Sequence, residues 1–302
     1  MSTDAAYRRF VSYIDRSREY YAAQGYDRPY RWARPEEAPA LQPLAAPLAE
    51  LRLAVVTSAF PLPPAGETAP VEVPYAQAVE PLPVGGFTAD DNRDHSVAPA
   101  NERESYLPLA RLGELAAERR IGSLSPRFYG APYAYSQRRT ITGDAPAVLD
   151  LLRADGVGAA LLAPHCPVCH QSLSLVARHL EANGVPTVLV GSARDIVEEI
   201  GVPRFLFVDV PLGYPFGRPG DAAQQRSVCA EALDLLERAW APRTTVQATA
   251  TWGDDSWRER YMRVDDTTRA SLAQAGDRRR ADQDEARATG RPLTAPSPTL
   301  MP

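Results

Sequence analysis

Two cysteines three residues apart, with a histidine on each outer side, are the residues best suited to chemistry in this sequence. The motif reads His165-Cys166-Pro167-Val168-Cys169-His170 and follows an apolar run, GAALLAP, at residues 158–164. A cysteine pair at this spacing can form a disulfide, bind a metal ion or simply pack in a core. The elements that carry the motif are needed to weigh these three interpretations.

The motif lies where a strand is expected to end and a helix to begin. The apolar run at 158–164 is typical of a buried strand, and residues 166–184 have the pattern of a helix that ends at Asn183-Gly184. A helix N-terminus carries partial positive charge and free N–H groups, which predicts a lowered pKa for the Cys166 thiol. Cys169 is expected on the same helical face, where it could resolve the product of an attack by Cys166 as a disulfide. Redox or nucleophilic use of the pair is therefore the favoured interpretation.

A zinc site is the main alternative to thiol chemistry. Structural zinc usually takes four ligands, whereas the two cysteines and one flanking histidine would supply three. The third cysteine, Cys229, lies within an apolar helical pattern, which predicts a core position. The flanking histidines, His165 and His170, could act as catalytic acids or bases, or could only tune the thiols. We therefore predict no metal at the motif and keep zinc as the alternative.

Alternating strand and helix patterns surround the motif. Short runs rich in β-branched residues alternate with segments that repeat apolar residues at helical spacing. The strands are expected at residues 51–59, 121–130, 158–164, 186–191 and 204–210, and the helices at 107–120, 145–156, 166–184, 194–201 and 224–240. This alternation predicts an α/β fold, a Rossmann-like parallel sheet with helices on both faces, which could comprise two similar sub-domains. Ligands bind such sheets outside the carboxyl ends of the strands, which is where the motif lies.

The flanking segments differ in composition from the alternating region and predict three parts. Residues 1–50 are expected to form an N-terminal helix over 5–25 and an extended, proline-rich wrap. Residues 51–250 are expected to form the α/β domain. Residues 251–302 are expected to contain one more docked helix and then, from about residue 277, a charged and proline-rich tail that is disordered or solvated.

Composition and charge argue against several classes of protein. The 302 residues carry a formal net charge of −5, which disfavours nucleic acid as a partner. No apolar run approaches the roughly 20 residues of a membrane span, and the N-terminus lacks the apolar core of a secretion signal. With 3 cysteines and no lysine, neither a disulfide-stapled secreted domain nor a lysine-dependent Schiff-base enzyme is expected. We therefore expect a cytoplasmic protein without a membrane partner, with a homodimer as the commonest form of assembly.

A polar stretch at residues 87–106 is one candidate for binding a substrate. Arg93, Asp94 and His95 lie within it and could bind an anionic group or transfer protons. A solvated loop without a chemical role is the alternative. The residues with similar placement further along the stretch are Asn101, Glu102 and Arg103.

A second candidate for binding a substrate is the loop after the strand at residues 204–210. Tyr214 and Arg218 lie in this loop, so they are expected at the same sheet edge as Cys166. Arg218 could hold a carboxylate with two parallel hydrogen bonds. The alternative is an ion pair that only stabilises the turn.

The cysteine motif and several segments around it resemble one known family. The segments that carry the resemblance are CPVCHQS, VPTVLV, FVDVPLGYPFGRPGD and YYAAQGYDRPYRWA, at residues 166–172, 185–190, 207–221 and 20–33. Together they resemble the selenoprotein B family of glycine, sarcosine, betaine and D-proline reductases, nearest to the small subunit of D-proline reductase. The resemblance spans most of residues 20–240. This sequence differs from the selenocysteine-containing members by having cysteine at Cys166.

The resemblance implies a thiol-dependent oxidoreductase with a reductase-like domain over residues 51–250. Cys166 matches the family's nucleophile, and Cys169 matches the second thiol that helps to regenerate it as a redox-active disulfide forms and is reduced. The family's reductases cleave a carbon–nitrogen bond of a small-molecule substrate. A thioredoxin-like protein or a low-molecular-weight thiol would restore the dithiol, and no cofactor of the chain's own is expected.

Two other functions stay open at the level of sequence. The family's reductases work with a separate pyruvoyl subunit, so the chain could be a metal-binding or non-catalytic subunit of a reductase complex with a pyruvoyl-type partner. The chain could also be a cofactor-free lyase or isomerase in which the cysteines act as acid and base.

Overall fold

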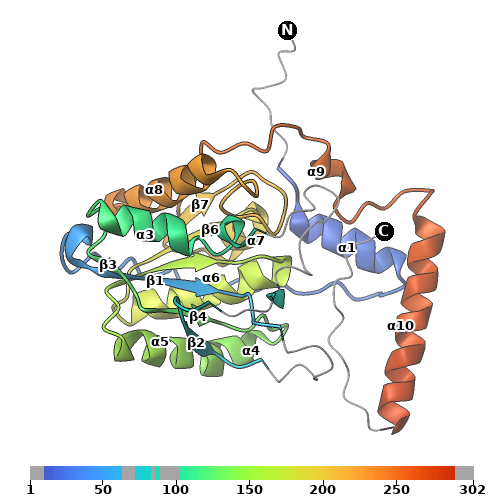
Figure 1. The fold of residues 1–302 in the computed structure, drawn as a ribbon. Helices are drawn as coiled ribbons and strands as arrows, with labels where there is room; N and C mark the ends of the chain where they lie inside the picture. The colour runs from blue at the N-terminus through green and yellow to red at the C-terminus, as the bar shows by residue number, and fades with distance from the viewer. Residues whose placement is uncertain (1–9, 63–71, 83–85, 89–101, 290–302) are drawn as a thin grey trace.

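A mixed, mostly parallel sheet forms the centre of the protein. The computed structural model describes residues 10–62, 72–82, 86–88 and 102–289 (Figure 1). Within these residues the strands form one eight-stranded sheet in the order β2-β4-β1-β5-β6-β7-β8, with β3 also paired to β1. The strands are β1 (Arg52–Thr57), β2 (Tyr75–Ala78), β3 (Ser123–Leu124), β4 (Arg127–Gly130), β5 (Ala159–Ala163), β6 (Thr187–Gly191), β7 (Arg204–Phe207) and β8 (Thr244–Gln247). Every pairing is parallel except that of β2 with β4. The predicted α/β fold is confirmed, and its strands in the described part lie in a single sheet.

The order of the strands creates one crevice at the carboxyl edge of the sheet. From β1 the chain crosses to β4 on one side, then returns past β1 to β5 on the other side, and continues outward through β6, β7 and β8. The direction of winding therefore reverses between β1 and β5. Such a reversal is where open α/β sheets bind ligands, because the connections leave the two strand ends in opposite directions. The cysteine motif directly follows β5 and so lies at this reversal.

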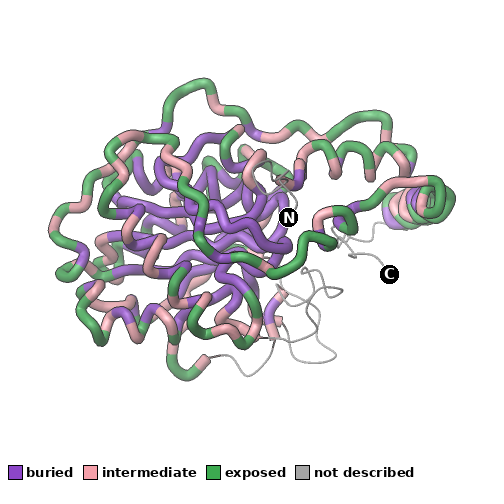
Figure 2. The backbone as a smooth tube through the Cα atoms, turned by 90° about the horizontal axis from the view of Figure 1, so that it is seen from above, coloured by how far each residue is buried: buried purple, intermediate pink, exposed green. Residues whose placement is uncertain are grey.

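Helices cover both faces of the sheet, as the alternating pattern predicts. The helices are α1 (Tyr13–Ala23), α3 (Leu109–Ala117), α4 (Gln137–Arg139), α5 (Ala145–Ala154), α6 (Pro167–Ala182), α7 (Arg194–Ile200), α8 (Ala222–Arg238), α9 (Trp257–Arg260) and α10 (Arg269–Thr289), with short 3-10 turns at Leu48–Glu50 and Arg103–Ser105 and a π-helical turn at Thr140–Asp144. Helices α3 and α8 pack on one face, and α5, α6 and α7 pack on the other. Figure 2 shows the buried residues concentrated in the sheet and the segments that flank it.

Alternate side chains of each strand supply the two cores. In β1, Leu53 and Val55 join the core under α3 and α8, whereas Ala54 and Val56 join the core under α5 and α6. This division follows from the two-residue period of a strand. Cys229 is fully buried in the first of these cores, in agreement with its predicted position. Because both faces are covered, the central strands are mostly apolar, and β5 is apolar along its whole length.

The proline-rich segment wraps around the outside of the α/β domain. Helix α1 begins at Tyr13, later than the sequence predicts, because the Ser12 side chain caps it by accepting from Asp15 N–H. Further along, the main chain of Gln42 meets the ion pair of Glu181 in α6 with Arg204 in β7. Both charged side chains are buried, so the wrap is fastened to the sheet at a site that excludes water.

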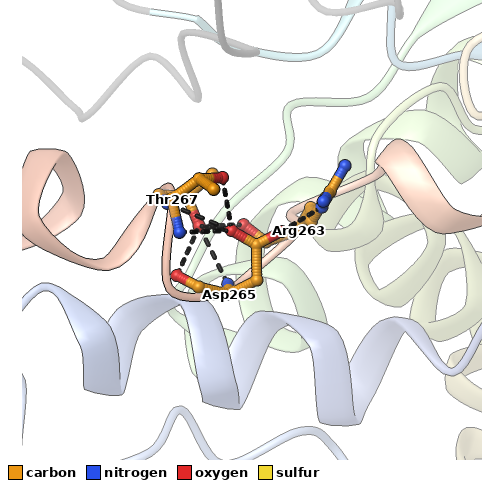
Figure 3. A network of polar contacts seen from close by, with 4 residues as sticks. Arg263, Asp265 and Thr267 are labelled. Carbon is orange, nitrogen blue, oxygen red and sulfur yellow. Dashed lines mark hydrogen bonds and ion pairs between the residues drawn. The ribbon is translucent and has the colours of Figure 1, made fainter.

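The C-terminal part of the chain departs from the sequence prediction. Residues 277–289, expected in a disordered or solvated tail, are helical and belong to α10. The helix starts at a capping network in which Asp265 accepts from Thr267 and Thr268 N–H and is paired with Arg263 (Figure 3). The Thr267 hydroxyl, which also donates to this carboxylate, is the largest cause that holds the pKa of Asp265 down at about 2, and the other bonds add to it. The apolar rhythm is missing because α10 packs mainly on α1 rather than on the core, as Figure 1 shows at the right of the view.

No helix of the described residues has the length and apolar composition needed to cross a membrane.

Candidate active site

Cys166 and Cys169 are joined by a disulfide at the N-terminus of α6. Cys166 is the N-cap residue, with extended backbone at φ −120° and ψ 168°, and Pro167 opens the helix without losing a hydrogen bond. The two Cα atoms lie 4.9 Å apart. Cys169 N–H donates to the Cys166 sulfur over 3.1 Å, so this sulfur sits at the positive end of the helix dipole. The predicted strand-to-helix position of the pair is confirmed.

His170 holds the backbone beneath the disulfide. Its Nδ1–H donates to the Cys166 carbonyl over 2.7 Å, and its Nε2 accepts from Ser192 N–H at 3.1 Å and Ala193 N–H at 3.2 Å. Because Nε2 accepts from two amides, the imidazole is neutral. Burial lowers the pKa of His170 to about 4, which agrees with this neutral form. Gly191 leaves room for the ring, since a Cβ at this position would lie 2.5 Å from Nε2.

His165 connects the two strands on either side of the winding reversal. Its Nε2 faces the Tyr106 carbonyl at 3.4 Å, which can only accept, so Nε2 carries the proton. Nδ1 therefore accepts from the hydroxyl of Ser58, the residue after β1, over 2.8 Å. Burial lowers the pKa of His165 to about 3. Both histidines thus use both ring nitrogens to fix the main chain that carries the cysteines.

An aromatic pocket opens onto Cys166. Its cavity volume is about 40 Å³. The residues that line it are Ser17, Tyr21, Tyr30, Trp32, Tyr133, Tyr135, Cys166, Pro167, Val168 and Met262. Of the two cysteines, only Cys166 belongs to this lining. An approaching molecule in the pocket therefore meets Cys166 rather than Cys169.

Four rings form a roof over the pocket, and hydrogen bonds hold it in place. We call Tyr30, Trp32, Tyr133 and Tyr135 the aromatic roof. Tyr30 packs edge-on against Trp32 and Tyr135, with ring centroids 5.0 Å and 5.5 Å apart, and its hydroxyl donates to the Tyr135 carbonyl. Gln171 of α6 accepts from Ala33 N–H and donates to the Tyr30 hydroxyl. The extended segment before β1 is thereby tied over the start of α6.

A second, larger pocket adjoins the first. Its free volume is about 370 Å³, and it lies between α1 and the segment from Tyr26 to Trp32. The residues common to both linings are Ser17, Tyr21, Tyr30 and Trp32. A displacement of the aromatic roof would join the two spaces beside Cys166.

Of the predicted substrate-binding residues, the two that the structure describes, Tyr214 and Arg218, do not line this pocket. Arg93, Asp94, His95 and Asn101 fall outside the described residues. Tyr214 is fully buried in a core, with its ring against Trp252. Arg218 lies near the surface and donates to the Thr251 carbonyl. Neither lines the pocket at Cys166, because the loop that carries them turns toward α8 and the segment at Thr251.

One further predicted residue, Glu102, binds that same loop. Glu102 accepts from Gly220 N–H and from the Gln225 amide. The Arg103 guanidinium instead lies 5.1 Å from the centre of the Phe87 ring. Glu102 therefore stabilises the contact between two loops at the sheet edge.

The sequence analysis missed the aromatic roof, Ser58 and Gln171. A usable signal existed for the roof, since aromatic residues gather at 20–32 and again at 129–135. Nothing in the pattern shows that these two stretches meet.

Within the described ranges, no three His, Cys, Asp or Glu side chains gather closely enough to hold a metal ion.

Comparison with known proteins gives one relative. The chain is 28% identical over 131 residues to D-proline reductase subunit gamma of Acetoanaerobium sticklandii. The match covers 43% of this chain and 54% of the relative, so the chain spans about half the length of the protein it matches. No protein-family model and no solved structure matches. The chain is therefore distantly related to that reductase family.

Proposed function

We propose that this chain is a thiol-dependent reductase in which Cys166 is the nucleophile and Cys169 the resolving thiol. The observation that carries the proposal is the disulfide at the N-terminus of α6, with Cys166 in the lining of the aromatic pocket at the winding reversal of the sheet. The distant relationship to a D-proline reductase subunit supports a role in a reductase. Within that relationship we propose a selenoprotein B-like chain with cysteine in place of selenocysteine.

The proposed reaction transfers two electrons from the dithiol to a substrate R–X. The Cys166 thiolate attacks R, forms a sulfur–R bond and displaces X, which leaves with the bonding electron pair. The Cys169 thiolate then attacks the Cys166 sulfur, forms the disulfide and releases R, which takes a proton. The sum is R–X plus two thiols giving R–H, H–X and the disulfide. R must stabilise negative charge for its release, so a carbon beside an electron-withdrawing group is the expected site of cleavage.

The histidines of the motif support this chemistry by holding the cysteines in position. Their ring nitrogens bind main-chain groups and Ser58, so we assign His165 and His170 to holding the cysteine loop rather than to proton transfer. A substrate-binding role for Arg93, Asp94 and His95 stays a prediction, which their single substitutions by alanine would test through the KM of the substrate.

Differential thiol alkylation read by mass spectrometry tests the proposed function. The chain would be compared as purified, after reduction and after mild oxidation. We expect Cys166 and Cys169 to change state together, because one reaction consumes both. Cys229 should stay free and slow to react, since burial raises its pKa. Cys166→Ser should abolish dithiol-dependent reduction of any substrate found, whereas the matched variant Cys229→Ser should retain it. Turnover by Cys166→Ser would contradict the proposal.

A non-catalytic or metal-binding role in a complex is the second candidate. It is favoured by the relative's being one subunit of its enzyme. In this case both cysteines would resist oxidation in the native chain and would react once a chelator removed zinc. Stoichiometric zinc that survives dialysis would establish it, and a pyruvoyl-type partner would then be sought as the catalytic subunit.

A further inference from the structure

Within the described residues, the aromatic pocket is where a molecule reaches the disulfide, and it does so at Cys166. Cys166 is 4% exposed and Cys169 is 1% exposed. Cys166 belongs to the lining of the aromatic pocket, whereas Cys169 does not and lies further along α6. A thiolate must approach one sulfur along the disulfide axis to displace the other. An external reductant that uses this pocket therefore attacks Cys166 and releases Cys169.

The aromatic roof limits the size of that reductant. The free space at Cys166 is about 40 Å³, and bulky rings surround it. A protein reductant carries its thiolate on a folded surface, which would have to displace the roof before the two sulfurs met. That displacement breaks the bonds from Gln171 to Ala33 and Tyr30 and from Tyr30 to Tyr135. A small thiol has no folded surface of its own, so it reaches Cys166 with a smaller displacement of the roof.

The lining also limits the charge of that reductant. All ten lining residues are uncharged in type, and burial raises the pKa of the Tyr133 and Tyr135 hydroxyls, which keeps them neutral. A carboxylate moved into this space would lose its water and would find hydroxyl and indole donors but no cation among the lining residues. The thiolate of the reductant is stabilised by the N-terminus of α6 at Cys166, whereas a carboxylate on the same molecule adds a second negative charge.

We propose that a small thiol without carboxylate groups, rather than a thioredoxin-like protein, reduces the Cys166–Cys169 disulfide through the aromatic pocket; this inference rests on the proposed function. The thiol loses its proton to water at the mouth of the pocket, and its thiolate attacks the Cys166 sulfur. A mixed disulfide forms, the Cys166–Cys169 bond breaks, and Cys169 leaves as a thiolate and takes a proton. A second thiol attacks the reductant's sulfur and releases Cys166. Two small thiols become one small disulfide, and the two cysteines gain the two electrons.

Reduction rates measured on the native, oxidised full chain test the inference. The reductants would be dithiothreitol, 2-mercaptoethanol, 3-mercaptopropionate and thioredoxin kept reduced by its reductase, with samples quenched by alkylation and read by mass spectrometry. The reference is the same disulfide in the free peptide of residues 154–178. Rates would be compared per thiolate. The pair 2-mercaptoethanol and 3-mercaptopropionate differs in charge at similar size, which separates charge from bulk.

We expect dithiothreitol and 2-mercaptoethanol to act on the native chain within about tenfold of their rates on the peptide. Thioredoxin should be slower on the native chain than on the peptide by about a hundredfold or more, because the roof must open first. The carboxylate thiol should fall between them. Equal thioredoxin rates on native chain and peptide would overturn the inference.

Variants of the roof provide the matched control. Gln171→Ala removes the bonds that tie the roof to α6, and Trp32→Ala removes one ring of it. Both should raise the thioredoxin rate on the native chain and change the dithiothreitol rate much less. A chain in which no Cys166–Cys169 disulfide forms would overturn the proposed function as well. A disulfide that forms, and that thioredoxin reduces as fast as in the peptide, would overturn only the choice of reductant.

Discussion

At the scale of single residues, the cysteines and the histidines of the motif have different roles. The cysteines occupy the positive end of α6, where a thiolate is stabilised, and the histidines bind the main chain on both sides of them. A histidine that donates through one nitrogen and accepts through the other is fixed in one neutral tautomer. Each histidine therefore serves the site by holding the cysteine loop in position. The folded protein therefore requires these imidazoles to stay uncharged.

This requirement predicts a loss of stability in weak acid. The pKa of His170 falls from an ordinary value near 6.5 to about 4 in the folded state, so the unfolded chain binds a proton first as the pH drops. The contribution is fully present above pH 6.5 and is lost progressively below it, down to about pH 4. Between pH 7.5 and pH 5 the single imidazole should lower the free energy of unfolding by about 2 kcal/mol. Urea unfolding at the two pH values measures it.

His170→Gln is the variant that isolates this effect. It should be less stable than the natural sequence at pH 7.5 but should lose less stability on going to pH 5. Buried carboxyls such as Glu181 and Asp195 have raised pKa values and act in the opposite direction, so the difference between the two chains is the informative quantity. An equal pH dependence in both chains would show that His170 is not buried neutral.

At the scale of elements, the sequence was a good guide wherever the contacts are local. The strand β5, the helix α6 and the end of α5 before Gly156 follow from apolar period, Pro167 and the positive φ of that glycine. The aromatic roof could not be predicted in this way, because Tyr30 and Tyr135 are 105 residues apart in the chain. Periodicity reports which face of an element is apolar. It does not report which distant segment will cover that face.

The wrap illustrates the same point and yields a prediction about stability. Arg204→Met would leave Glu181 buried without its charged partner and would remove the hydrogen bond to the Gln42 carbonyl. Breaking one side of a buried ion pair typically costs about 3–5 kcal/mol, which urea unfolding would measure. Hydrogen exchange should also speed up in residues 35–47. The double variant Arg204→Met with Glu181→Leu should recover part of the loss, since it leaves no unpaired charge. A single variant of natural stability would refute this account of the wrap.

At the scale of the whole molecule, the first and last helices of the described chain, α1 and α10, meet beside the sheet. Helix α10 packs on α1, and neither core under the sheet contains a residue of α10 (Figure 1). Arg279 and Arg280 donate to Gln24, the residue that follows α1. The contact is close at Gly276, where a Cβ would lie 1.9 Å from the Gln24 carbonyl oxygen. Glycine at this position is what allows the two helices to touch.

Gly276→Val should therefore release α10 while leaving the α/β domain folded. The added side chain cannot fit against the Gln24 backbone, so we expect residues 269–289 to lose their protection from hydrogen exchange. The free energy of unfolding of the domain should change by less than about 1 kcal/mol, because its cores do not include α10. Ala281→Val, at an exposed position of the same helix, is the matched control and should keep α10 docked. If Gly276→Val destabilised the domain together with the helix, α10 would belong to the cooperative unit, and the boundary predicted near residue 251 would have to be abandoned.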